Sequence, residues 1–154
     1  MTARLSHCLT GIALALFAAV ASAGDAPAVS DAWARATPPG VDVGAAYMVI
    51  QGGDRGDRLV AASSERAAMV HLHTVEEQDG VARMRAVDAV DVPAGQRVML
   101  APKSTHLMLM GLDGPLVAGQ SFTVTLRFAE SGPQTITVAV RSATGDDDHA
   151  GHQH

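Results

Sequence analysis

The segment HLMLM at residues 106–110 alternates two kinds of side chain, which a strand would place on opposite faces. His106 and Met108 then share one face about 6.6 Å apart, close enough for both to bind one ion. Imidazole nitrogen and thioether sulfur are neutral ligands, and the soft thioether favours Cu(I) over Zn, Mg or Ca. This face therefore predicts half of a site for a soft metal ion.

A second histidine–methionine pair lies in the hairpin predicted for residues 71–87. If Asp79-Gly80 forms a two-residue type I′ turn, Val75 pairs with Met84, and Met84 becomes the diagonal neighbour of His73 on the same face. A three-residue loop would shift this register. With the two-residue turn, two imidazoles and two thioethers are available for a four-coordinate site. The candidate ligands are His73, Met84, His106 and Met108.

Histidine and methionine also have common structural roles. Methionine often fills gaps in a hydrophobic core, and a histidine beside a core is usually just hydrogen-bonded. We expect four further methionines to be core residues: Met48, Met69, Met99 and Met110. His71 shares a face with His73 in a regular strand, so it is an auxiliary donor, a support for the ligands or an exposed histidine. We favour the exposed role.

The chain ends in SATGDDDHAGHQH, residues 142–154, which has no apolar side chain larger than alanine and is predicted to be a disordered tail. Its histidines, His149, His152 and His154, stand beside a run of aspartates. Imidazole and carboxylate together suit Cu(II), and also Zn or Ni. We interpret the tail as a second site that takes Cu(II); an extension that only keeps the protein soluble is the alternative.

The elements that must position these side chains are short strands separated by turns rich in Gly and Pro. No long segment has a convincing helical period. The pattern predicts an all-β chain, an antiparallel sandwich or barrel, with one domain over residues 24–141. Candidate strands span residues 29–36, 45–51, 57–64, 69–77, 81–88, 96–102, 106–112, 121–128 and 134–141.

Residues 1–23 have the features of a cleaved signal peptide. Arg4 supplies a positive charge, residues 9–20 form an apolar run, and ASA at 21–23 matches a signal-peptidase site. The run is too short and Ala-rich for a good membrane span, although an uncleaved anchor is the alternative. Cleavage would remove Cys8, the one cysteine, which precedes the apolar run whereas a lipoprotein cysteine follows it. We expect a secreted, periplasmic domain without disulfides and without stable membrane insertion.

Charge and composition argue against several function classes. The net charge is −5 at pH 7, the chain has one lysine, and it has one Trp, one Tyr and three Phe. Without a basic cluster or a stacking platform, we expect no nucleic acid as partner. No Ser/His/Asp or paired-carboxylate arrangement stands out, and a blue-copper carrier needs a thiolate that the mature chain would lack. We predict that the protein is not an enzyme.

The four candidate ligands are spaced as in the metal-binding motif that they resemble, that of the periplasmic copper chaperones of the PCu(A)C family. Ten residues separate His73 from Met84, twenty-one separate Met84 from His106, and one separates His106 from Met108. The flanks DAWARATPPG, GAAYMVI, DGVARMRAV and VPAGQRVMLAPKSTHLMLMGL are also similar to family sequence. The resemblance covers residues 29–141.

This resemblance implies a cupredoxin-like antiparallel β-sandwich of the Greek-key type that holds Cu(I) through two histidines and two methionines. It also implies delivery of copper to cytochrome oxidase assembly, with cytochrome oxidase subunit II or a Sco-type thioredoxin-like protein as acceptor. A periplasmic copper buffer without a specific acceptor would use the same ligands and is the alternative. A purely structural sandwich module is the further alternative.

Overall fold

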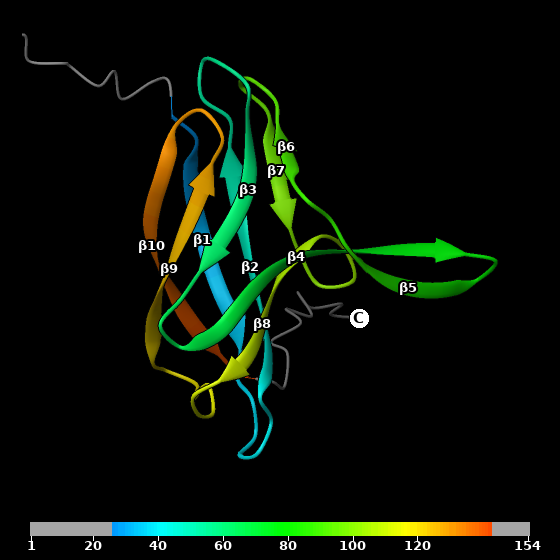
Figure 1. Cartoon of the computed structure of the whole chain (residues 1–154), viewed down its shortest axis with the longest axis vertical. Helices are drawn as coiled ribbons and strands as arrows, with labels where there is room; N and C mark the ends of the chain where they lie inside the picture. The colour runs from blue at the N-terminus through cyan, green and yellow to red at the C-terminus, as the bar shows by residue number, and fades with distance from the viewer. Residues whose placement is uncertain (1–25, 143–154) are drawn as a thin grey trace, which may run out of the picture.

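Ten β-strands form the regular structure of the chain in a computed structural model that describes residues 26–142 (Figure 1). They are β1 (Ala28–Arg35), β2 (Val43–Gln51), β3 (Asp57–Ser63), β4 (Ala67–Gln78), β5 (Val81–Ala86), β6 (Val90–Val92), β7 (Arg97–Leu100), β8 (His106–Leu112), β9 (Ser121–Phe128) and β10 (Gly132–Arg141). In this part of the chain, no helix is long and apolar enough to cross a membrane.

The all-β prediction is confirmed, and each of the nine predicted strand segments overlaps a strand of the structure. Short apolar or alternating runs bounded by turn residues favour β-strands. The sequence did not reveal β6. This strand has three residues, Val90–Val92, which are too few for a two-residue period to be recognised.

The strands form one sheet that closes on itself, in the order β5-β4-β8-β2-β1-β10-β9-β3-β6. β7 also pairs with β2. Ala62 of β3 pairs with Val70 of β4, and this contact closes the sheet on itself. One described pair departs from the antiparallel pattern, because β1 runs parallel to β10. Parallel neighbours need a long crossover connection, and here the whole intervening chain supplies it.

The core lies between the two layers and follows from the alternation of side chains along the strands. In β9, every second residue from Phe122 to Phe128 is buried. Leu107 and Leu109 of β8 are completely buried in the same cluster. Burying one such side chain contributes about 1.5–3 kcal/mol. The apolar face of β8 is therefore fixed toward the core, and its other face is available for different chemistry.

The β4–β5 hairpin extends away from the body of the sandwich (Figure 1). Its turn residues Asp79 and Gly80 have φ values of +54° and +74°, the left-handed conformation that a type I′ turn requires at both positions. Val75 pairs with Met84, so the predicted register is confirmed. All of β5 is exposed, so this strand does not contribute to the core.

A buried carboxylate fastens the start of β3 to the turn between β9 and β10. Asp57 accepts hydrogen bonds from the backbone N–H groups of Arg58, Glu130 and Ser131 and from the Ser131 hydroxyl, at 2.6–3.0 Å. Burial raises the pKa of Asp57, but the Ser131 hydroxyl and the three backbone donors outweigh it, so the pKa lies below its usual value. This carboxylate is ionised and fully partnered at neutral pH.

Candidate metal centre

The two faces of β8 carry different chemistry, as its alternation predicts. Leu107 and Leu109 face the core, whereas His106, Met108 and Met110 line the outer face. His106 is nevertheless only 5% exposed, because it packs between neighbouring rings. Its ring centroid lies 6.2 Å from that of Tyr47 and 6.1 Å from that of His73. β8 thus presents a shielded histidine and a half-buried methionine on one surface.

Pairing between β4 and β8 brings the two predicted histidines directly opposite each other. His73 is the register partner of His106, and His71 is the partner of Met108. Two imidazoles that share one ion at metal–nitrogen distances of about 2.0 Å have ring centroids roughly 5–6 Å apart. The observed 6.1 Å between the ring centroids of His73 and His106 lies just beyond this range, so the two imidazoles are close neighbours across the β4–β8 pair.

Met84 approaches the same place from the projecting hairpin. It is the diagonal neighbour of His73, because Val75 pairs with Met84 and His73 pairs with Ala86. Met84 lines one cavity of about 440 Å³ together with His106 and Met108. His73 is not among the lining residues of that cavity, but it adjoins His106. The structure therefore brings the four predicted side chains together, and their role as metal ligands stays a prediction.

The two histidines differ in how their ring nitrogens are satisfied. The Nδ1 of His106 lies 2.9 Å from the backbone oxygen of Ser104, so Nδ1–H donates to that carbonyl and Nε2 is the ring nitrogen left for a ligand. The buried Nδ1 of His73 has no hydrogen-bond partner among the described residues. Burial, together with the charges of His106 and His71, lowers the pKa of His73. The lowered pKa favours the neutral form of the His73 imidazole, which is the form that binds a metal ion.

The structure revises the expected roles of the other methionines. Met48 is buried, as predicted, but the core assignment was wrong for Met69 and Met99, which are 53% and 57% exposed. Met110 is half-buried on the outer face of β8, opposite Met69 on β4, and does not belong to the core cluster. The error has a simple cause: an isolated methionine in a strand does not reveal which face its neighbours bury. The two-residue spacing of Met69 from His71 was the available signal.

His71 is exposed on the same face as His73, as favoured from the sequence, and the two ring centroids lie 6.2 Å apart. Sequence reasoning did not identify two features of this surface. One is the Ser104 carbonyl that orients His106, and the other is the methionine pair beside His71. Both depend on tertiary pairing, which spacing along one strand does not show.

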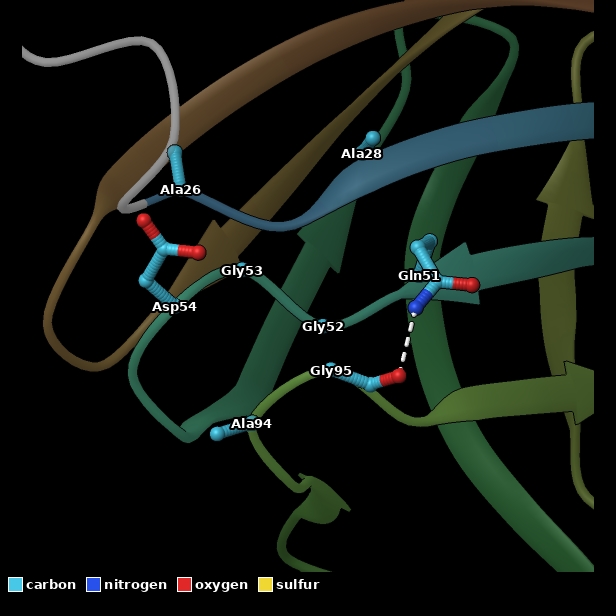
Figure 2. A pocket seen from close by; sticks show the side chains of 8 residues that line it. All are labelled: Ala26, Ala28, Gln51, Gly52, Gly53, Asp54, Ala94 and Gly95. Atoms are coloured by element: carbon cyan, nitrogen blue, oxygen red, sulfur yellow. Dashed lines mark hydrogen bonds between the residues drawn. The ribbon is translucent and has the colours of Figure 1, made fainter.

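A second cavity, of about 480 Å³, offers different chemistry (Figure 2). Its lining is mostly Ala and Gly, with Gln51 and Asp54 as the polar side chains, and the Gln51 amide donates a hydrogen bond of 2.8 Å to the Gly95 carbonyl. It contains no histidine or methionine. Across residues 26–142, no group of three or more His, Cys, Asp or Glu side chains is placed to hold a metal ion. The candidate centre therefore differs from this cavity by the thioethers of Met84 and Met108.

Several predictions from the sequence fall outside the described residues. These are the signal peptide at 1–23, Cys8, and the tail with His149, His152 and His154. The predicted boundaries of the domain and of the tail accordingly stay predictions.

Comparison with known proteins gives consistent matches over the sandwich. The family "Putative lipoprotein LpqE-like" matches residues 27–140. "Putative lipoprotein Lxx21020" of Leifsonia xyli subsp. xyli is 36% identical over 142 residues, which cover 89% of this chain and 84% of that protein. The lipoprotein description belongs to those proteins.

Two solved structures show the same fold. The copper-bound PCuAC domain from PmoF2 is 27% identical with a TM-score of 0.66, and the match covers 79% of this chain and 97% of that one. The solution structure of CuI-DR1885 from Deinococcus radiodurans is 28% identical with a TM-score of 0.60, covering 80% and 81%. The predicted resemblance is confirmed, and the chain belongs to the LpqE-like family with the fold of PCuAC domains.

Proposed function

We propose that this protein is an exported copper chaperone that binds one Cu(I) through His73, Met84, His106 and Met108. The observation that carries the proposal is the buried Nδ1 of His73, which lies beside His106 and has no hydrogen-bond partner within residues 26–142. A buried polar atom without a partner costs about 1–3 kcal/mol, so its persistence needs a reason. A metal ion held with the two thioethers supplies one, and the structural similarity to a copper-bound PCuAC domain supports copper as that ion.

The donor set suits an ion that must be held and then released. All four donors are neutral, and soft thioethers stabilise Cu(I) relative to harder ions. Met84 is 54% exposed on the projecting hairpin, so a partner can displace it first. His106 is shielded and oriented by the Ser104 carbonyl, so it is the more firmly placed ligand. Transfer then needs only stepwise ligand exchange and no catalytic group.

Delivery to cytochrome oxidase assembly in the periplasm is the proposed role, with cytochrome oxidase subunit II or a Sco-type protein as acceptor. The chaperone role is supported by the spacing of the four ligands, which matches the chaperone motif. The periplasmic location is supported by the LpqE-like family, whose name describes lipoproteins. A copper buffer that has no specific acceptor remains the second candidate. Transfer of Cu(I) to purified apo-acceptors, followed by separation of the proteins, distinguishes the two.

The tail is proposed as a separate Cu(II) site, because His149, His152 and His154 with neighbouring aspartates offer nitrogen and oxygen donors but no sulfur. Deleting residues 145–154 should remove one Cu(II)-binding event and leave Cu(I) binding nearly unchanged. If the shortened protein keeps every Cu(II)-binding event, the tail acts only as a solubility extension.

A matched pair of substitutions tests the domain site. Met84 and Met99 are strand methionines with nearly equal exposure, 54% and 57%, but only Met84 lines the cavity with His106 and Met108. In Cu(I) titrations against a competing chelator, Met84→Leu should weaken binding at least about 10-fold, whereas Met99→Leu should not change it. Equal affinities for the two variants would remove Met84 from the ligand set.

A further inference from the structure

The outer face of the β4–β8 pair carries metal donors beyond the four proposed ligands. Three register pairs follow one another: His73 with His106, His71 with Met108, and Met69 with Met110. Successive pairs on one face of a sheet are about 6.6 Å apart. The donors therefore continue as a row, and its far end, formed by Met69, His71 and Met110, is not used by the proposed site.

Among the described residues, none of these three side chains belongs to the hydrophobic core cluster. Met69 is 53% exposed, His71 is exposed, and Met110 is half-buried. On the opposite face of the same strands, Leu72 and Leu109 belong to the core cluster. A large apolar side chain left in water gives up about 1.5–3 kcal/mol of burial energy. Packing within the described chain therefore does not explain why Met69 faces outward.

The backbone at this end of the pair is held in close approach. Gly111 has φ +65°, and a Cβ at that position would lie 2.8 Å from the Cβ of Ala68. A side chain at residue 111 would thus be strained by conformation and by contact. Glycine lets β4 and β8 stay paired beyond the first site, so Met69 and Met110 remain directly opposite each other.

We propose that Met69, His71 and Met110 form a second Cu(I) site, one step along the row from the first. The inference rests on the proposed function, because it assumes that the neighbouring site takes Cu(I). Two thioethers and one imidazole are neutral and soft, which selects Cu(I) over Zn and over the hard divalent ions. With three donors and greater exposure, this site binds more weakly than the first and exchanges its ion more readily with solution.

Methionine methyl groups report on each site separately in the full chain. The protein is labelled with [methyl-13C]methionine, each resonance is assigned by a Met→Leu substitution, and Cu(I) is added stepwise under reducing conditions. The tail contains no methionine, so copper bound there leaves these signals unmoved. Met48, which is buried, and Met99, which is exposed outside the row, serve as internal references.

The first equivalent should shift the Met84 and Met108 methyls, and a later one should shift those of Met69 and Met110. His71→Asn and the double variant Met69→Leu/Met110→Leu should each weaken the later event at least 10-fold and spare the first. The proposal is overturned if Met69 and Met110 follow Met99 throughout the titration, whether all three move or none does. If Met84 and Met108 stay unmoved while Met69 and Met110 shift, the first site fails and the second stands.

Discussion

The carboxylate of Asp57 and the Nδ1 atom of His73 are both buried, but only the carboxylate has hydrogen-bond partners among the described residues. Asp57 receives four hydrogen bonds, and the three from Glu130 and Ser131 join β3 to the β9–β10 turn. The Nδ1 of His73 receives none from the described residues, although it lies on a well-paired strand. A fully partnered buried group stabilises the fold, whereas a buried group that finds no partner among the described residues costs stability and is free to bind a ligand.

The largest expected effect on folding comes from removing the satisfied group. Asp57→Ala leaves the backbone N–H groups of Glu130 and Ser131 without their acceptor, so it should lower the free energy of unfolding by about 3 kcal/mol. Asp54→Ala, an exposed carboxylate nearby, should change it by less than about 0.5 kcal/mol. Urea unfolding measures both. Equal effects would mean that the four hydrogen bonds contribute nothing specific.

Removing the imidazole of His73 should affect copper binding strongly and the free energy of unfolding little. His73→Leu replaces a buried, unpartnered nitrogen by an apolar group, so the metal-free protein should be as stable as the wild type or up to about 1 kcal/mol more stable. Its Cu(I) affinity should fall about 100-fold, because one of the proposed imidazole ligands is lost. Denaturation and chelator competition on the same sample give the two values. A large loss of stability would make His73 a structural residue.

The smallest expected effect is on the pH dependence of stability, to which His73 and Asp57 contribute in different pH ranges. Because the pKa of His73 is lowered by burial, the unfolded chain binds a proton there more readily than the folded chain does. The stability of the metal-free protein should therefore fall as the pH drops below about 6.5 and level off below the folded pKa.

The lowered pKa of Asp57 acts in a second window, where stability present above about pH 3.9 is lost as the pH falls further. His73→Leu should abolish only the upper window, and unfolding curves across the pH range would show this. Persistence of the upper window in His73→Leu would assign it to another histidine.

Local rules were sufficient for much of this structure. The Asp79-Gly80 turn fixed the β4–β5 register, and that register placed Met84 beside His73 before any tertiary contact was known. The alternation in HLMLM identified the outer face of β8 in the same way. Both are features of neighbouring residues in sequence, for which the two-residue period is reliable.

The features that escaped prediction depend on how distant strands meet. The pairing of His73 with His106, the closing contact of β3 with β4 and the parallel β1–β10 pair all join segments whose order in the sheet no local pattern encodes. The exposure of Met69 and Met99 follows from that order as well, because only the packed layers decide which face is covered. The unpartnered nitrogen of His73 is visible only once its surroundings are built.

The central claim is that two imidazoles and two thioethers hold one Cu(I), and X-ray absorption at the copper edge tests it most directly. The full chain is loaded with one equivalent of Cu(I) under reducing conditions, and wild type is compared with Met108→Leu. This substitution roughly conserves volume and should cost less than about 1.5 kcal/mol of stability. The expected first shell contains both nitrogen and sulfur, and it loses sulfur in the variant. A shell without sulfur, or one that Met108→Leu leaves unchanged, would contradict it.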